Sequence, residues 1–156
     1  MSAEALLLAL RQSLGELAVL TDERDLEPYC HDWRHMFKGR PLCALLPRNT
    51  EQVAAAVRLC AAAGYSVVPQ GGNTGLSGGA TPDDSGRQVV LSLARMNAIR
   101  HIDVVGETIE VEAGCVLQTA QEAVAEQGLL LPISLAAEGS ARIGGIVSTN
   151  AGGTNV

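Results

Sequence analysis

The hydrophobic positions of this chain first follow a helical period. From Ala3 to Val19, leucines and alanines recur at helical spacing with polar residues between them, which predicts an amphipathic helix. Residues 21–41 lose this period and carry prolines and a glycine, so we expect an irregular connector there. The connector holds Trp33 and Phe37, the only Trp and Phe of the chain, and we expect these apolar side chains to pin it to a core.

After the connector, short apolar runs alternate with helical segments. Residues 42–46 predict a strand, and Asn49 or Thr50 is suited to cap a helix that runs to Ala63. Residues 67–68 predict the next strand, which completes a parallel β-α-β unit.

The rest of the chain predicts a more antiparallel arrangement. We expect a strand at residues 88–93, a hairpin from 98–104 and 108–112, a helix over 115–127 and an extended segment at 129–132. Together these elements indicate an α+β fold.

Glycine is concentrated in two short runs, residues 69–79 and residues 138–153. Each run holds five of the 17 glycines. Glycine costs backbone entropy on folding and is tolerated in number where the chain needs positive φ or a very close approach to another group. Two such runs indicate one ligand that is held twice.

Composition limits the kinds of ligand, the compartment and the groups that can hold an anion. The net charge of −6, without a basic block, argues against nucleic-acid and anionic-membrane surfaces. No apolar stretch is long enough for a membrane span, and four dispersed cysteines suit free thiols in a reducing compartment, so we expect a cytoplasmic protein. Lys38 is the only lysine, so an anion must be held by arginine, by main-chain N–H groups or by a helix N-terminus.

Pyrophosphate is the commonest ligand of a glycine-rich turn after a buried strand. A Walker A loop needs a lysine after its glycines, and the position of Lys38 excludes one. A Rossmann fingerprint needs glycines where this chain has Asn73 and Thr74, and the segment that follows is too rich in Gly, Pro and Asp for a helix.

Four segments in order resemble a known family. They read VVPQGGNTGLSGG, VVLSLARMN, IEVEAGC and IGGIVSTNAGG, and they span residues 67–153. They look like the PCMH-type FAD-binding domain of the vanillyl-alcohol-oxidase flavoproteins, and within it most resemble the D-2-hydroxyacid dehydrogenases of D-lactate, D-2-hydroxyglutarate and glycolate. Tyr29, Asp32 and Trp33 are similar to a Tyr and an Asp-Trp pair found before this domain in that group.

The resemblance implies the N-terminal part of a two-subdomain FAD-binding domain. It implies a helical arm at residues 1–40 and a FAD-binding domain at 41–156 that is incomplete at its C-terminal end, with a separate substrate domain beyond. The complete protein would oxidise a D-2-hydroxy acid to a 2-oxo acid, and the catalytic residues and metal ligands would lie outside this chain, which we expect to be inactive alone. Another FAD-linked oxidase of the same superfamily, or a truncated and inactive nucleotide-binding module, remains the alternative.

The resemblance also implies the cofactor contacts. The first loop would wrap the FAD pyrophosphate and the second run would line the ribityl and isoalloxazine side. The residues so implied are Pro69, Gln70, Gly71, Gly72, Asn73, Thr74, Gly75, Leu76, Ser77, Gly79, Pro132, Gly139, Ser140, Gly144, Gly145, Ser148, Thr149 and Asn150. The first loop has no histidine or cysteine, so we expect noncovalent FAD.

Other polar positions have simpler explanations. His31 and His35 are spaced as two metal ligands on a helix, but the nearby proline and glycine favour a solvated arm. His101 is expected to face outward from a strand, and Asp83 and Asp84 to form an exposed turn. If the domain is incomplete, unpaired strand edges and uncovered apolar surface predict self-association.

Overall fold

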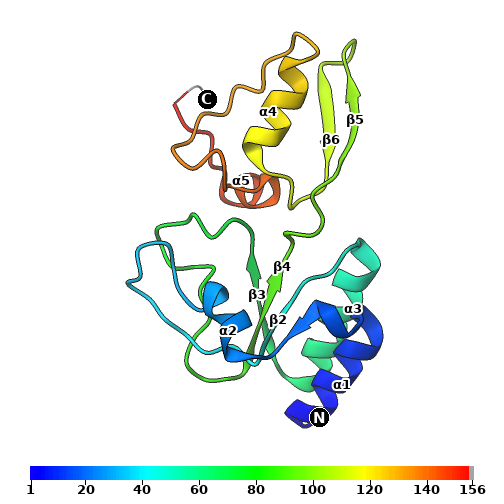
Figure 1. The fold of residues 1–156 in the computed structure, drawn as a ribbon, viewed down its shortest axis with the longest axis vertical. Coiled ribbons are helices and arrows are strands. Elements are labelled where there is room, and N and C mark those ends of the chain that lie inside the picture. The colour runs from blue at the N-terminus through cyan, green and yellow to red at the C-terminus, as the bar shows by residue number, and fades with distance from the viewer. Residues whose placement is uncertain (155–156) are drawn as a thin grey trace. The chain divides into compact units, whose positions relative to one another are not determined.

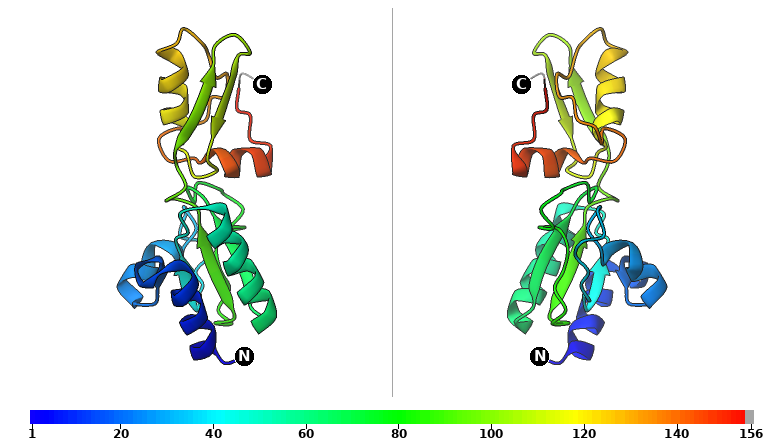
Figure 2. Two further views of the ribbon diagram at one scale, coloured as in Figure 1. Left: turned by 90° about the vertical axis from the view of Figure 1, so that its right-hand side faces the viewer. Right: turned by 90° about the vertical axis from the view of Figure 1, so that its left-hand side faces the viewer.

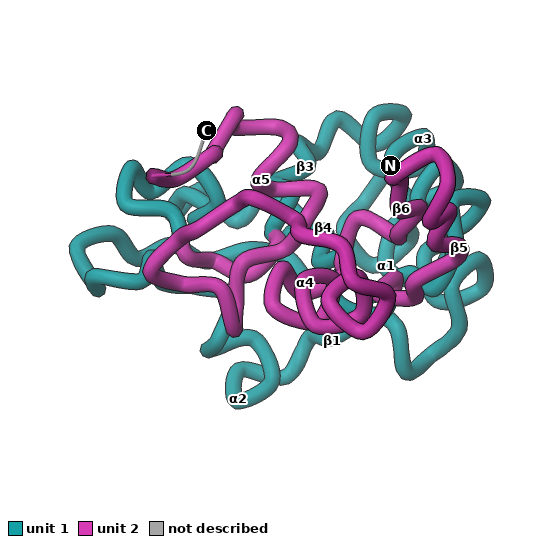
Figure 3. The backbone as a smooth tube through the Cα atoms, turned by 90° about the horizontal axis from the view of Figure 1, so that it is seen from above, with its two compact units in different colours: residues 1–70, 75–95 teal, residues 71–74, 96–156 magenta. Residues whose placement is uncertain are grey.

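The computed structural model describes residues 1–154, which form two compact units (Figures 1 and 3). Unit 1 comprises residues 1–70 and 75–95, and unit 2 comprises residues 71–74 with the chain from Met96 onward. The first glycine run therefore passes from unit 1 into unit 2 and back. Each unit is described by itself.

Unit 1 is built on a four-stranded sheet. Its strands are β1 (Val19–Leu20), β2 (Cys43–Leu45), β3 (Ser66–Gln70) and β4 (Gln88–Ser92), in the order β1-β2-β4-β3. Strands β2 and β3 both run parallel to β4, and β1 is antiparallel to β2. The β-α-β unit is confirmed, with β4 inserted between its two strands. Strand β4 was expected in the more antiparallel part of the chain, and this was wrong because it is parallel to both neighbours.

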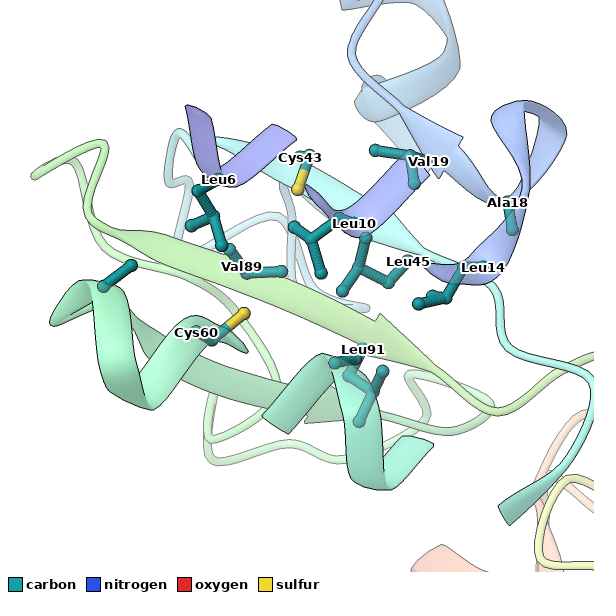
Figure 4. Packing of buried hydrophobic residues seen from close by; sticks show 12 residues of the cluster. Leu6, Leu10, Leu14, Ala18, Val19, Cys43, Leu45, Cys60, Val89 and Leu91 are labelled. Carbon is teal, nitrogen blue, oxygen red and sulfur yellow. The ribbon is translucent and has the colours of Figure 1, made fainter. Parts of the chain in front are cut away.

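Both faces of this sheet are buried, as expected for parallel strands. One face carries Cys43, Leu45, Val89 and Leu91, which pack in one core with α1 (Ala3–Leu14) and α3 (Thr50–Ala63). Figure 4 shows Leu6, Leu10 and Leu14 of α1 and Cys60 of α3 directed toward these strands. The opposite face carries Ala44 and Val90, which pack with Leu26 and Cys30. Side chains that alternate along β2 and β4 thus supply both cores.

The ends of the two long helices are set by local sequence. Asn49 accepts the N–H of Gln52 and Gly64 adopts the left-handed conformation, so α3 begins and ends as predicted. The prediction for α1 was too long: Gly15, with φ 92°, ends it after Leu14. Val19, which the helical period included, instead lies in β1 and pairs with Leu45.

The connector contains more structure than predicted, and one expectation about it was wrong. It forms a short helix α2 (Glu23–Leu26) and a 3-10 turn (Glu27–Tyr29). Trp33 is 66% exposed and does not pin the connector to a core. Phe37 is 48% exposed, and its ring lies against Gly78, where a Cβ would come within 2.5 Å of it.

The described part of unit 2 consists of a hairpin and two helices (Figure 2). Strands β5 (Ile99–Asp103) and β6 (Thr108–Val111) pair antiparallel, as predicted, with His101 exposed. Helix α4 (Leu117–Ala125) is two residues shorter at each end than the prediction. Helix α5 (Ile143–Thr149) lies inside the second glycine run and was not predicted. Within residues 1–154, no helix is long and apolar enough to cross a membrane.

All four cysteines are buried and free. Burial raises the pKa of the Cys43 thiol to about 12, with a further contribution from Cys60. The ordinary value is 9.0, so above that pH the unfolded chain releases a proton that the folded chain retains. The stability due to this thiol is therefore complete below pH 9 and is lost as the pH rises toward 12.

We expect the free energy of unfolding to fall by up to about 1.4 kcal/mol per pH unit for this thiol in that range. Urea unfolding followed by far-UV circular dichroism between pH 7.5 and 10.5 measures the slope. Cys43→Ala lowers stability at every pH because it leaves a cavity, but its slope is expected to be shallower. Equal slopes for the variant and the wild type would contradict this explanation.

Candidate functional site

The two glycine runs meet in unit 2 at main-chain contact distance. A Cβ built on Gly72 would lie 1.9 Å from the carbonyl oxygen of Ser140 and 3.2 Å from the Cα of Ala141. Only a residue without a side chain allows this approach. The expectation from sequence was that both runs hold one ligand, and the structure brings loop 71–74 and segment 139–142 together.

Loop 71–74 is further shaped by a left-handed residue. Asn73 has φ 52°, a conformation that asparagine adopts more readily than most residues. This conformation turns successive peptide N–H groups of a loop toward one side, which is how anion-binding concavities form. The left-handed residue in loop 71–74 is therefore one element of such an anion-binding concavity.

Segment 113–116, which includes the last three residues of the IEVEAGC motif, holds the second run in place. The N–H of Gly144 donates to the carbonyl of Ala113 at 2.8 Å, and a Cβ on Gly144 would come within 2.8 Å of the Ala113 Cβ. The N–H of Ile143 donates to the carbonyl of Cys115 at 2.9 Å. On the inner side of α5, Ile146 packs with Leu117.

Gly145 differs from Gly144 in having open space around it. It lies inside α5, its φ is not positive, and no atom comes within 4 Å of a Cβ built on it. Glycine in a helix interior is about 1 kcal/mol less favourable than alanine. Neither conformation nor packing within the described residues requires a glycine here, which is the pattern of a position kept clear for a ligand.

Two polar side chains of α5 form hydrogen bonds with the backbone of the helix itself. The hydroxyl of Ser148 donates to the carbonyl of Gly144 at 2.7 Å, and that of Thr149 to the carbonyl of Gly145 at 2.8 Å. Each hydroxyl therefore presents acceptor lone pairs rather than its proton to a ligand. Asn150 ends the helix in the left-handed conformation with φ 52°.

In unit 1, buried side chains fix the segments that lead into and out of the loop. The amide nitrogen of Gln70, which is 4% exposed, donates to the carbonyl of Ala80 at 2.9 Å and to that of Tyr29 at 3.4 Å. The side chain of Gln70 thus ties the glycine run to the connector. Its main-chain contact to a cofactor stays a prediction.

The connector is attached to the same run through the Asp-Trp motif. Asp32 is 2% exposed and accepts the N–H groups of Phe37 and Arg34, at 2.6 and 3.1 Å, and these hydrogen bonds lower the pKa of its carboxyl group. Arg34 in turn donates to the carbonyl of Leu76 at 2.7 Å. Sequence reasoning had assigned no role to Arg34, and its place directly after the motif was the available signal.

The predicted cofactor residues differ in exposure. Gln70 is buried, the residues of loop 71–74 and Gly144 are half-buried, and the others are exposed. The exposed ones are Pro69, Gly75, Leu76, Ser77, Gly79, Pro132, Gly139, Ser140, Gly145, Ser148, Thr149 and Asn150. Loop 71–74 and the residues from Pro132 onward lie in unit 2, and Pro69, Gln70 and residues 75–79 lie in unit 1.

No side-chain cluster in residues 1–154 is suited to hold a metal ion. His31 lies 2.7 Å from a carboxylate oxygen of Glu27, and its ring is 5.3 Å from that of His35. Asp83 accepts the N–H of Ser85 in an exposed turn, as expected.

Comparison with known proteins identifies the family. Residues 41–156 match the family model described as the FAD binding domain, which covers most of the chain. The chain belongs to the FAD-binding domain family. The predicted boundary at residue 41 coincides with the start of this match, and the separation of an arm at residues 1–40 stays a prediction.

Relatives of this FAD-binding domain share about 40% of its residues. The D-2-hydroxyglutarate dehydrogenase of Xanthomonas citri pv. viticola is 43% identical over 96% of this chain and 31% of its own length. The mitochondrial D-2-hydroxyglutarate dehydrogenase of Bos taurus is 42% identical over 88% of this chain and 25% of its own. The putative mitochondrial D-lactate dehydrogenase of Schizosaccharomyces pombe is 39% identical over 85% of this chain and 25% of its own length. The chain thus spans about a quarter to a third of the length of these relatives, and the cytoplasmic location stays a prediction.

Solved structures confirm the fold. Alkyldihydroxyacetonephosphate synthase superposes with a TM-score of 0.85 at 18% identity, covering 95% of this chain and 29% of the other. A substrate-bound p-cresol methylhydroxylase superposes with a TM-score of 0.73 at 26% identity, and the match covers 94% of this chain and 28% of the other. The α+β fold is that of the N-terminal part of a PCMH-type FAD-binding domain, as the sequence predicted.

The residues of unit 2 fit an FAD cofactor. Loop 71–74 contains a left-handed residue of the kind found in anion sites, and Gly145 leaves room that no described residue fills. The buried Nε of Arg142 has no hydrogen-bond partner in the described part of the chain. A left-handed loop turn and an unsatisfied cationic donor are features that a diphosphate would complete, and the open position is one that another part of the cofactor would fill.

Proposed function

We propose that this chain forms the FAD-holding part of a dehydrogenase that oxidises a D-2-hydroxy acid to a 2-oxo acid. The observation that supports the cofactor assignment is the close approach of Gly72 to Ser140, which brings the two glycine runs into contact. The relatives that carry the substrate assignment are named for D-2-hydroxyglutarate and D-lactate.

In this proposal the chain binds and orients the cofactor noncovalently. Loop 71–74 would hold the pyrophosphate with main-chain N–H groups, and α5 would present its open Gly145 side to the ribityl and isoalloxazine part. When bound, FAD would supply the acceptor for the hydride that leaves C2 of the hydroxy acid. The hydroxyl proton would pass to a base outside the residues described here, so substrate oxidation requires more than this chain.

The proposal is tested by mixing the purified chain with excess FAD, removing free cofactor by desalting and recording the visible spectrum. We expect flavin absorbance to stay with the protein, and acid precipitation to leave it in the supernatant because the attachment is noncovalent. A colourless protein that also fails to quench flavin fluorescence in titration would overturn the cofactor assignment. Yellow colour in the acid pellet would overturn noncovalent binding alone.

The substrate class needs a separate measurement. A chimera in which this chain replaces the matching segment of the Xanthomonas relative is expected to retain FAD and to oxidise D-2-hydroxyglutarate. The rest of the chimera comes from the relative, so the measurement tests whether this chain holds FAD in the position that this reaction needs. A chimera that retains FAD but no longer oxidises D-2-hydroxyglutarate would contradict the hydroxyacid part of the proposal.

A further inference from the structure

Positive charge is scarce in unit 2. Its cations at neutral pH are Arg100 and Arg142, and it contains no lysine. Arg100 is paired with the carboxylate of Glu112 on the hairpin, whereas Arg142 forms no ion pair with any residue in the range 1–154. Arg142 is therefore the uncompensated cation of this unit.

Arg142 lies directly against the loop that is expected to bind pyrophosphate. A Cβ built on Gly71 would be 3.3 Å from the Cβ of Arg142 and 3.5 Å from its Cγ. The stem of the arginine therefore packs on the first residue of loop 71–74. The N–H of Ile146 donates to the carbonyl of Arg142 at 3.0 Å, so the backbone of this residue is fixed where α5 begins.

The guanidinium group is only partly satisfied. Its Nη1 donates to the carbonyl of Gly114 at 2.8 Å, but its Nε is buried and has no partner among the described residues. A buried donor without an acceptor is costly, and an arginine fork is suited to two parallel hydrogen bonds with one phosphate. The pKa of the neighbouring Cys115 is raised by burial, and the charge of Arg142 opposes that rise.

We propose that Arg142 is a cofactor-binding residue that supplies the cationic contact to the pyrophosphate of FAD. This inference rests on the proposed function. Main-chain N–H groups of loop 71–74 carry only partial charges, and carboxylates outnumber arginines in unit 2. Arg142 compensates the negative charge that the diphosphate brings into this acidic unit. Its side chain already contacts loop 71–74 through Gly71.

The hydrogen bond from Arg142 to Gly114 raises a competing explanation, in which Arg142 only supports segment 113–116. A support would affect every part of the cofactor equally, whereas a phosphate contact affects only ligands that carry phosphate. FAD, ADP and riboflavin separate the two roles, because ADP has the pyrophosphate without the flavin and riboflavin has the flavin without the pyrophosphate.

The experiment measures dissociation constants of these three ligands for the wild type, Arg142→Gln, Arg142→Lys and the control Arg100→Gln, at low and high salt. We expect Arg142→Gln to weaken FAD and ADP binding at least tenfold and to change riboflavin binding less than twofold. Arg142→Lys retains the charge and is expected to recover part of the loss. Salt should weaken FAD binding to the wild type more than to Arg142→Gln, since salt screens the contact.

Arg100→Gln is the matched control because it removes an arginine of the same unit that is already paired, and all three constants are expected to stay within twofold. Riboflavin binding that falls in parallel with FAD binding would show that Arg142 is only a support. Unchanged FAD and ADP binding in Arg142→Gln would overturn the inference while leaving the proposed function intact. A wild type that binds neither FAD nor ADP would overturn both.

Discussion

Replacing Gly72 with alanine is expected to lower the free energy of unfolding of unit 2 by about 3 kcal/mol and to abolish retention of FAD. The new Cβ would lie 1.9 Å from the carbonyl oxygen and 2.7 Å from the carbonyl carbon of Ser140. Both are main-chain atoms, so no rotamer change relieves the overlap. Loop 71–74 and segment 139–142 must separate, and the site that they form together is lost.

The measurement is urea unfolding followed by far-UV circular dichroism and by hydrogen exchange of unit 2. The single tryptophan, Trp33, lies in unit 1, so its fluorescence does not report on this transition. Gly75→Ala is the control for stability, because a Cβ there meets nothing within 4 Å and its φ is not positive. A Gly72→Ala protein that unfolds at the same urea concentration as the wild type would contradict the close contact.

Replacing Gly145 with alanine is expected to have the opposite combination of effects. Stability should stay constant or rise by up to about 1 kcal/mol, because alanine is the better residue in a helix interior and the position is open. FAD binding should weaken at least tenfold, because the added methyl group occupies space that the proposal assigns to the cofactor. Thermal unfolding and fluorescence titration with FAD measure the two effects on the same samples.

The adjacent Gly144 provides the matched variant. Its Cβ would come within 2.9 Å of the carbonyl oxygen of Ala113, so Gly144→Ala is expected to lower stability by about 1 to 3 kcal/mol. Two neighbouring alanine substitutions in one helix are thus expected to separate packing from ligand binding. If Gly145→Ala binds FAD as the wild type does, the open side of α5 does not face the cofactor.

The helices show why local signals succeed in some places and fail in others. Helix α3 has its cap, its period and its glycine stop within its own sequence, so its bounds followed directly. Helix α5 was missed because Gly144 and Gly145 argue against a helix by propensity. It forms because Ile146 is buried with Leu117 and because Ala113 and Cys115 accept its first N–H groups, and these partners are distant in sequence.

In the connector, a local signal predicted the wrong buried residue. Apolar character alone predicted a buried Trp33, but the structure buries its neighbour Asp32 instead. The Asp32 carboxylate accepts hydrogen bonds from the N–H groups of Arg34 and Phe37. These bonds close the turn, and the Trp33 ring stays exposed. Hydrogen-bond geometry of this kind depends on the folded path of the loop and has no periodic signal.

The sequence by itself determined the α+β class, the β-α-β unit, the hairpin, the two glycine runs and the family, because each is recognised from short stretches of neighbouring residues. Tertiary structure decided which glycines serve packing and which stay open. Gly72 and Gly144 are needed because main-chain atoms of distant segments reach them, whereas no described atom reaches Gly145. It also decided that Arg142 lies on loop 71–74, since a contact between residues 71 positions apart, Gly71 and Arg142, depends on how the intervening chain folds.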